Sequence, residues 1–147
     1  VVRGTVIALQ PGRTFGTSAE SALQYAAATI RIEEVVAGRV QERDAAELTL
    51  EIPLFDGIDS IGSIASSLVG SDGVFLLRNK GETARAAGLS SAQQRRDAAY
   101  YRLLVFGGLV GNDAGRASAG ADELGVLGQL DGLSFPDAVE RIREASR

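Results

Sequence analysis

One stretch of eight residues limits the possible folds more than any other part of the chain. In Glu47–Leu54 (ELTLEIPL), leucine or isoleucine occupies every second position, and charged or polar residues or proline lie between them. A period of two places alternate side chains on opposite faces of a β-strand. The stretch therefore predicts a half-buried strand, with Pro53 at its end or on an edge, because proline lacks the N–H that a sheet ladder uses.

Further strands are predicted where β-branched and aliphatic residues gather. These segments are 1–9, 23–36, 74–77 and 100–106, and short strands are expected around a hairpin turn at 112–115. Pro11-Gly12 predicts a turn after the first strand. The alternation slips after Glu33, which predicts a bulge or the end of pairing.

Helices are predicted at three places. Residues 58–69 are expected to form a short helical turn, and Ser91 followed by Gln94 is expected to cap a surface helix within 83–98. The strongest helix signal is Ser134, an N-cap residue followed by an apolar stripe, which predicts a helix over about 134–146. That stripe is expected to cover one end or face of the barrel, and the alternative is that it is exposed and docks onto a partner protein. It consists of Phe135, Ala138, Val139 and Ile142.

Five or six strands with turns between them, no βαβ alternation and only one long helix, late in the chain, favour an antiparallel barrel or sandwich. A small Greek-key barrel fits best. There is no repeat at a fixed period and no long linker, so residues 1–147 are expected to form a single domain.

Several segments, taken in order, resemble a known group of proteins. The segments are VVRGTVIAL, TIRIEEVVAG, GVFLLRNKG, YYRLLVFGGL and LDGLSFPDAVERI. They resemble uncharacterised small exported or lipid-anchored proteins of actinobacteria, whose barrel is similar to the OB-like module of tissue metalloproteinase inhibitors and netrins. The resemblance covers most of the chain, but its motifs are hydrophobic runs that end in glycine.

The resemblance implies a mainly β fold, a five- or six-stranded antiparallel OB-like (Greek-key) barrel with a C-terminal α-helix. It also implies a binding role and a secreted or cell-envelope location, with the cytoplasm as the alternative. It carries over no functional residue. The metalloproteinase inhibitors chelate zinc through an N-terminal cysteine, whereas this chain starts at Val1 and has no cysteine.

The absence of two residue types removes whole classes of chemistry. The chain has no histidine and no cysteine. Without histidine there is no Ser-His-Asp site, no imidazole acid–base catalysis and no histidine metal ligand. Without cysteine there is no thiolate nucleophile, Fe–S cluster or Cys-ligated zinc. We therefore expect no enzyme activity, no catalytic or metal-binding residues and no cofactor.

Carboxylates remain as candidates, because a pair of them can hydrolyse a glycosidic bond. The candidate pairs are Glu33/Glu34, Glu47/Glu51, Asp56/Asp59 and Asp122/Glu123. All are expected to be solvated surface charges, as is Lys80, the only lysine, in an Asn-Lys-Gly turn. The calcium-like run Asp56–Ser60 is expected to be a turn and the Gly107–Gly111 stretch a hairpin.

The charge balance and hydropathy limit the partners. The net charge of −4 argues against nucleic acid, whose binding depends on a basic surface. No run reaches the roughly 18 apolar residues of a membrane span. The lack of an initiator methionine at Val1 would be explained equally well by a removed export signal or by trimming.

A binding site is predicted in Pro11–Gly16, the connection expected between the first two strands. It displays Arg13 and Phe15, and arginine and aromatic residues are frequent interface anchors. The alternative, which the usual burial of phenylalanine favours, is that Phe15 folds back to cap the end of the barrel. OB-type barrels bind through such loops. The predicted function is a non-catalytic binding or protein-interaction module, with a protein or a small ligand as its partner. The alternatives are an inhibitor of an exported enzyme and a hydrolase that uses carboxylates alone.

Overall fold

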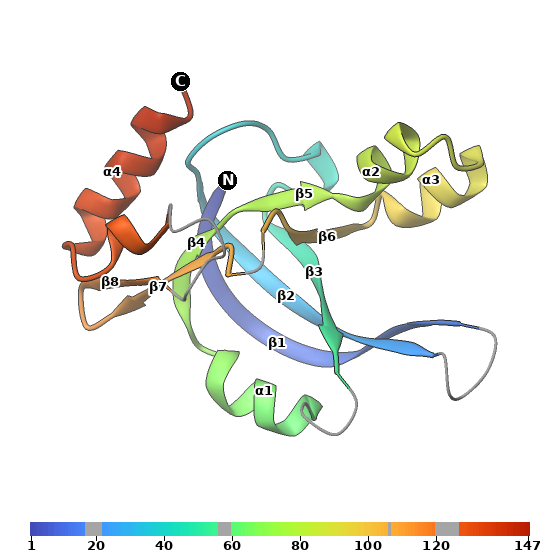
Figure 1. The fold of residues 1–147 in the computed structure, drawn as a ribbon, viewed down its shortest axis with the longest axis horizontal. Coiled ribbons are helices and arrows are strands. Elements are labelled where there is room, and N and C mark those ends of the chain that lie inside the picture. The colour runs from blue at the N-terminus through green and yellow to red at the C-terminus, as the bar shows by residue number, and fades with distance from the viewer. Residues whose placement is uncertain (17–21, 56–59, 106, 120–126) are drawn as a thin grey trace.

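The computed structural model describes residues 1–16, 22–55, 60–105, 107–119 and 127–147. Within these residues the chain forms a mixed α/β fold in which one strongly curled, half-barrel sheet is accompanied by four α-helices (Figure 1). The sheet has eight strands in the order β5-β6-β3-β2-β1-β4-β7-β8. The expectation of five or six strands was therefore too low.

Three long strands form a meander at the centre of the sheet. β1 (Val2–Phe15) pairs antiparallel with β2 (Leu23–Val35), and β2 pairs antiparallel with β3 (Glu47–Leu54). The bounds of β3 match those predicted from its alternation. The predicted bulge after Glu33 is also confirmed, because Glu34 lies opposite Arg3 while Ile32 lies opposite the next residue, Gly4.

Five short strands complete the sheet. They are β4 (Asp72–Phe75), β5 (Leu77–Asn79), β6 (Tyr100–Leu103), β7 (Leu109–Asp113) and β8 (Arg116–Ala119). β4 pairs with β1 and β7, whereas β5 pairs with β6 at the far edge. The segment 74–77, predicted as one strand, is thus divided at Leu76. The pairing of β6 with β3 is parallel, so the sheet is mixed and not purely antiparallel as expected.

The predicted turn at Pro11-Gly12 was wrong, because β1 runs through it. Pro11 lies opposite Ala26 of β2, and the register shifts between Pro11 and Thr14. Beyond Thr5, β1 has no pairing with β4, so a residue without an N–H is tolerated at an edge beside a bulge. A side chain at Gly12 would come within 2.8 Å of the carbonyl oxygen of Tyr25, so glycine lets the two strands approach closely.

The α-helices are α1 (Ile61–Leu68), α2 (Lys80–Ala86), α3 (Ser91–Asp97) and α4 (Phe135–Ala145). The hydroxyl of Ser134 accepts a hydrogen bond from the N–H of Asp137, as the N-cap prediction requires. The cap of α3 is Ser90, paired with Gln93, one residue earlier than predicted. None of the helices in the described ranges has the length and apolar character needed to cross a bilayer.

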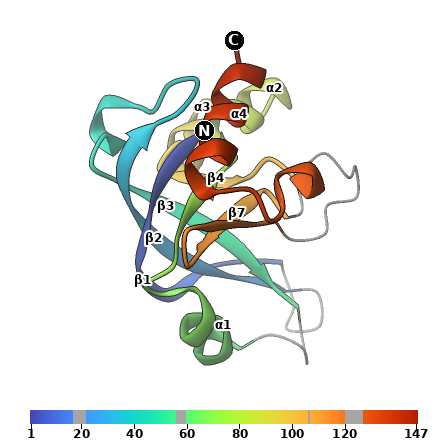
Figure 2. The same ribbon diagram turned by 90° about the vertical axis from the view of Figure 1, so that its left-hand side faces the viewer.

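Most buried apolar side chains of the described residues belong to one of two clusters. One lies inside the curl of the sheet and consists of Val2, Val6, Ala28, Ile30, Leu48, Leu50, Phe75 and Tyr101. The other lies beneath α4, whose predicted apolar stripe is buried against Val74 and Val110 of the sheet. Figures 1 and 2 show α4 and α1 at opposite ends of the molecule.

Candidate functional site

Glu51 is the most unusual residue of the sheet. It was predicted to be a solvated charge because it lies on the face of β3 opposite the leucines, yet its side chain is 0 % exposed. Glu47, which lies four residues earlier on the same face of β3, is exposed as expected. A buried carboxylate is costly unless cations and hydrogen bonds compensate it, so its surroundings decide what it can do.

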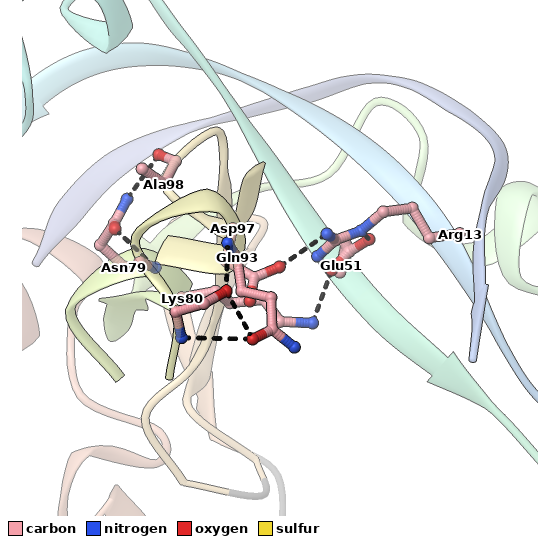
Figure 3. Close-up of polar contacts among 9 residues, drawn as sticks. Arg13, Glu51, Asn79, Lys80, Gln93, Asp97 and Ala98 are labelled. Atoms are coloured by element: carbon pink, nitrogen blue, oxygen red, sulfur yellow. Dashed lines mark hydrogen bonds and ion pairs between the residues drawn. The ribbon is translucent and has the colours of Figure 1, made fainter. Parts of the chain in front are cut away.

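Two cations bind both oxygens of this carboxylate. Arg13 donates from Nε to Oε1 of Glu51 at 2.6 Å and from Nη2 to Oε2 at 2.7 Å. Lys80 donates from Nζ to Oε2 at 2.6 Å. Arg13 also donates from Nη1 to Oδ1 of Asp97 at 2.7 Å. Figure 3 shows these four residues, which we call the Glu51 cluster: two cations and two carboxylates that balance in charge.

The cluster joins parts of the chain that are distant in sequence. Arg13 lies near the end of β1, Glu51 in β3, Lys80 at the first position of α2 and Asp97 at the last position of α3. Lys80 is therefore not a solvated turn residue, as was predicted. Its side chain is 16 % exposed, because the cluster covers it.

Asn79 fixes the position of Lys80 (Figure 3). Its Oδ1 accepts from the N–H groups of Gly81 and Glu82 and so caps α2. Its Nδ2 donates to the carbonyl oxygen of Ala98, just after α3. One buried amide therefore ties together the beginning and the end of the α2–α3 segment.

Aromatic rings surround the two cations. The guanidinium of Arg13 lies 3.9 Å from the ring centre of Tyr100 and 4.9 Å from that of Phe15. The ammonium of Lys80 lies 4.6 Å from the ring centre of Tyr25 and 5.3 Å from that of Phe15. Phe15 and Tyr25 also meet edge to face at 5.5 Å. The rings shield the cations from water and add cation–π attraction.

Arg13 and Phe15, the two residues predicted to bind a partner from a loop, are instead part of β1. The structure brings them together, but the guanidinium of Arg13 is already bound by Glu51 and Asp97. Phe15 covers the Glu51 cluster with one face and remains 42 % exposed. Of the two, only Phe15 presents an available surface.

The cations keep Glu51 ionised. Burial alone would raise its pKa, but the hydrogen bonds from Arg13 and Lys80 outweigh that effect and lower it. The bond to Glu51 in turn raises the pKa of Arg13. Burial, reinforced by the charge of Glu51, raises the pKa of Tyr25. An ionised carboxylate whose oxygens are both held by cations has no proton to donate and is poorly placed to attack a substrate.

A pocket of about 570 Å³ lies beside the cluster. The pairing between β3 and β6 is limited to Thr49 with Tyr100 and Leu50 with Tyr101, and the pocket lies between the residues that follow on both strands and α1. Its apolar lining consists of Ile52, Pro53, Phe55, Ile64, Leu68, Leu103, Leu104 and Val105. Its polar lining includes Tyr25, Glu51, Lys80 and Arg102. The volume falls within the roughly 300–1,000 Å³ typical of small-molecule sites.

The described residues do not assemble the carboxylate pair that a hydrolase needs at this pocket. In that part of the chain Glu51 is the only carboxylate in the lining. Glu33 and Glu34 are surface residues that pair with Arg3 and Arg143. The other candidate pairs, Asp56/Asp59 and Asp122/Glu123, lie outside the described residues, as does most of the predicted Asp56–Ser60 turn. No group of three or more acidic side chains is placed to hold a metal ion within the described ranges.

No protein-family model, curated protein or solved structure matches the chain. The resemblance to exported actinobacterial proteins therefore remains an expectation from sequence motifs.

Proposed function

We propose that this chain is a non-catalytic binding module with an OB-like barrel, and that it takes a small ligand in the pocket between β3 and β6. The observation that carries the proposal is the pocket itself, a cavity of about 570 Å³ that is mostly apolar and bordered by charged side chains. Cavities with apolar walls and a few polar groups at fixed positions are typical of small-molecule sites.

The pairing of the strands supports the OB-like part of the proposal. β1, β2 and β3 form an antiparallel meander, and β3 then pairs parallel with β6. β4 and β5 are separated by Leu76 alone; β4 pairs with β1 and β5 with β6, so together they join the two sides of the curl. OB-type barrels bind ligands over the second and third strands and the adjoining loops. The Glu51 cluster and the pocket lie at that position.

A hydrolase that uses carboxylates alone is less well supported. Such an enzyme needs an acid with a raised pKa and a second carboxylate across the scissile bond. The pKa of Glu51 is lowered, and its oxygens are bound to Arg13 and Lys80. We expect no turnover of chromogenic glycosides above the rate in buffer; turnover that is lost in Glu51→Gln would favour the hydrolase.

An inhibitor of an exported enzyme is a second candidate, favoured by the shape of the β1–β2 hairpin. The end of this hairpin projects from the rest of the molecule (Figure 1), and Phe15 and Leu23, opposite one another near its end, are 42 % and 37 % exposed. This candidate predicts inhibition of a secreted hydrolase that is lost in Phe15→Ser. A panel of secreted proteases and glycosidases in which none is inhibited would exclude it.

The secreted or cell-envelope location belongs to the same proposal and rests on the sequence resemblance. It predicts that the protein fractionates with the envelope or the culture medium of the cells that produce it. Recovery in the cytosolic fraction alone would contradict it.

The binding function can be tested with Nile red, an uncharged dye whose fluorescence rises in apolar sites. We expect saturable binding of one dye per chain. Ser67 lines the pocket and Ser66 does not, and both are exposed on α1. Ser67→Trp should fill the pocket and weaken binding by at least about tenfold, a loss of roughly 1.4 kcal/mol. Ser66→Trp is the matched control and should bind like the wild type.

Two results would contradict the proposed function. One is the absence of saturable dye binding. The other is equal binding by the two tryptophan variants, which would place the dye elsewhere on the surface.

A further inference from the structure

We infer that the ligand of this pocket is an amphiphile with one apolar tail and one carboxylate, and that Arg102 holds the carboxylate. This inference rests on the proposed function, because it names the class of ligand for the same pocket. It follows from an unpaired cation in the pocket wall and from the distribution of apolar side chains around it.

The side chain of Arg102 makes no ion pair or hydrogen bond in the described part of the chain. Its Nε is shielded from water and makes no hydrogen bond, although the residue as a whole is partly exposed and lines the pocket. A shielded donor without a partner destabilises a fold unless something else binds it. Its neighbour across the β5–β6 ladder is Arg78, another cation, which adds repulsion. An anion bound by the other nitrogens of the guanidinium would relieve this repulsion.

The other charges at the pocket do not meet this need. Lys80 and Glu51 bind one another, and the second carboxylate oxygen is bound by Arg13. Among the described residues, the pocket wall therefore has one carboxylate and two cations, which leaves the charge of Arg102 uncompensated there. A carboxylate suits this cation, because the two Nη groups of a guanidinium can donate in parallel to its two oxygens.

The rest of the lining indicates an apolar tail. Ile52, Ile64 and Leu68 lie along the pocket, and Phe55 and Leu104, which also line it, are each 45 % exposed. The free energy gained when a hydrocarbon tail packs against such side chains increases with the apolar surface area that is buried. Each buried methylene group should therefore strengthen binding roughly fourfold. A small hydrophilic acid could satisfy Arg102 but would leave these side chains in contact with water.

Isothermal titration calorimetry with decanoate, below the concentration at which it forms micelles, tests the inference. We expect decanoate to bind at least about tenfold more tightly than decyltrimethylammonium, which has a tail one methylene longer and the opposite charge. Acetate, which has the head without the tail, should show no measurable binding.

Arg102→Gln should weaken decanoate binding by about tenfold or more, because a charge-assisted bond is lost. It should leave Nile red binding unchanged, since the dye carries no charge. Arg78→Gln is the matched control: it removes the facing cation of the same ladder, does not line the pocket and should not weaken decanoate binding. Arg102→Lys keeps the charge but cannot donate two parallel hydrogen bonds, so its affinity for decanoate should lie between those of the wild type and Arg102→Gln.

The outcomes separate this inference from the proposed function. Suppose that Nile red binds, but that decanoate and the ammonium compound bind equally, or that Arg102→Gln binds decanoate like the wild type. Then the inference that the ligand has a carboxylate is wrong, and the proposed binding function stands. If acetate binds as tightly as decanoate, the inference that the ligand has an apolar tail is wrong. If neither decanoate nor Nile red binds, both proposals fail. If Arg102→Gln loses Nile red as well, Arg102 shapes the pocket and its assignment to the carboxylate is overturned.

Discussion

The substitution Glu51→Gln tests whether the Glu51 cluster stabilises the fold. The carboxylate accepts three charge-assisted hydrogen bonds, two from Arg13 and one from Lys80, with lengths of 2.6, 2.7 and 2.6 Å. Glutamine has nearly the same shape but offers one acceptor oxygen and an NH₂ group. That NH₂ group would face a cation that can only donate.

The expected loss can be worked out from these contacts. A hydrogen bond to a charged group contributes roughly 1.5–3 kcal/mol, and at least one of the three is lost and replaced by two opposed donors. The side chains of Arg13 and Lys80 are 23 % and 16 % exposed, so water recovers part of their solvation, and Arg13 retains Asp97. We expect the free energy of unfolding to fall by about 3 kcal/mol, at the lower end of values for breaking a buried ion pair.

Urea unfolding followed by circular dichroism at pH 7 measures this loss. Glu47→Gln is the matched control, since it makes the same change on the same strand at an exposed position. It should alter the free energy of unfolding by no more than about 0.5 kcal/mol. If Glu51→Gln is as stable as Glu47→Gln, the cluster contributes nothing and the argument is refuted.

The pH dependence gives an independent check of the same charge. The pKa of Glu51 in the folded chain is lowered from its ordinary value of 4.5. Its contribution to stability is therefore complete above pH 4.5 and is lost as the pH falls through the folded pKa, because the unfolded state takes up a proton first. The difference in stability between wild type and Glu51→Gln should narrow below pH 4.5. A difference that grows in acid would contradict the lowered pKa.

Two further predictions concern the fold. Ile142→Asp places a charge where the wild-type side chain is 7 % exposed beneath α4, and should lower the free energy of unfolding by a few kcal/mol; an unchanged melting temperature would show that α4 is not needed to cover the sheet. Gly4→Ala should be strongly destabilising, because the new methyl group would lie 2.2 Å from the carbonyl oxygen of Arg31. Gly62 lies in α1 with open space around it, so Gly62→Ala should instead stabilise the fold by up to about 1 kcal/mol. Equal urea midpoints for the two alanine variants would refute the close approach at Gly4.

Local patterns predicted several elements well. The alternation in Glu47–Leu54 gave both ends of β3, and Ser134 gave the start of α4, because these signals depend on residues that are near in sequence. The slip after Glu33 gave the bulge for the same reason. Periodicity reports the local backbone, and the local backbone determines these features.

The candidate site could not be predicted in this way. Alternation showed that Glu51 points away from the leucines, but not that Arg13, Lys80 and Asp97 would cover that side. Arg13 and Lys80 lie 38 and 29 residues from Glu51 in sequence, and Asp97 lies 84 residues from Arg13, its partner in the cluster. One sequence signal could have indicated that this side of β3 is covered. Aromatic residues such as Tyr25 occur at the ends of neighbouring strands, and aromatic side chains are seldom fully solvated.

The division of one strand at Leu76 links the inside of the sheet to the Glu51 cluster. The N–H of Leu76 donates to the carbonyl oxygen of Gly108 on one flank, and its carbonyl oxygen accepts from the N–H of Leu104 on the other. Lys80 follows four residues later. Because side chains in a strand alternate, one residue inserted after Leu76 would move each following side chain of β5 to the opposite face. We therefore expect the chain to tolerate changes of side chain at this point far better than changes of length, since an insertion would turn Lys80 away from Glu51 while leaving β4 in register.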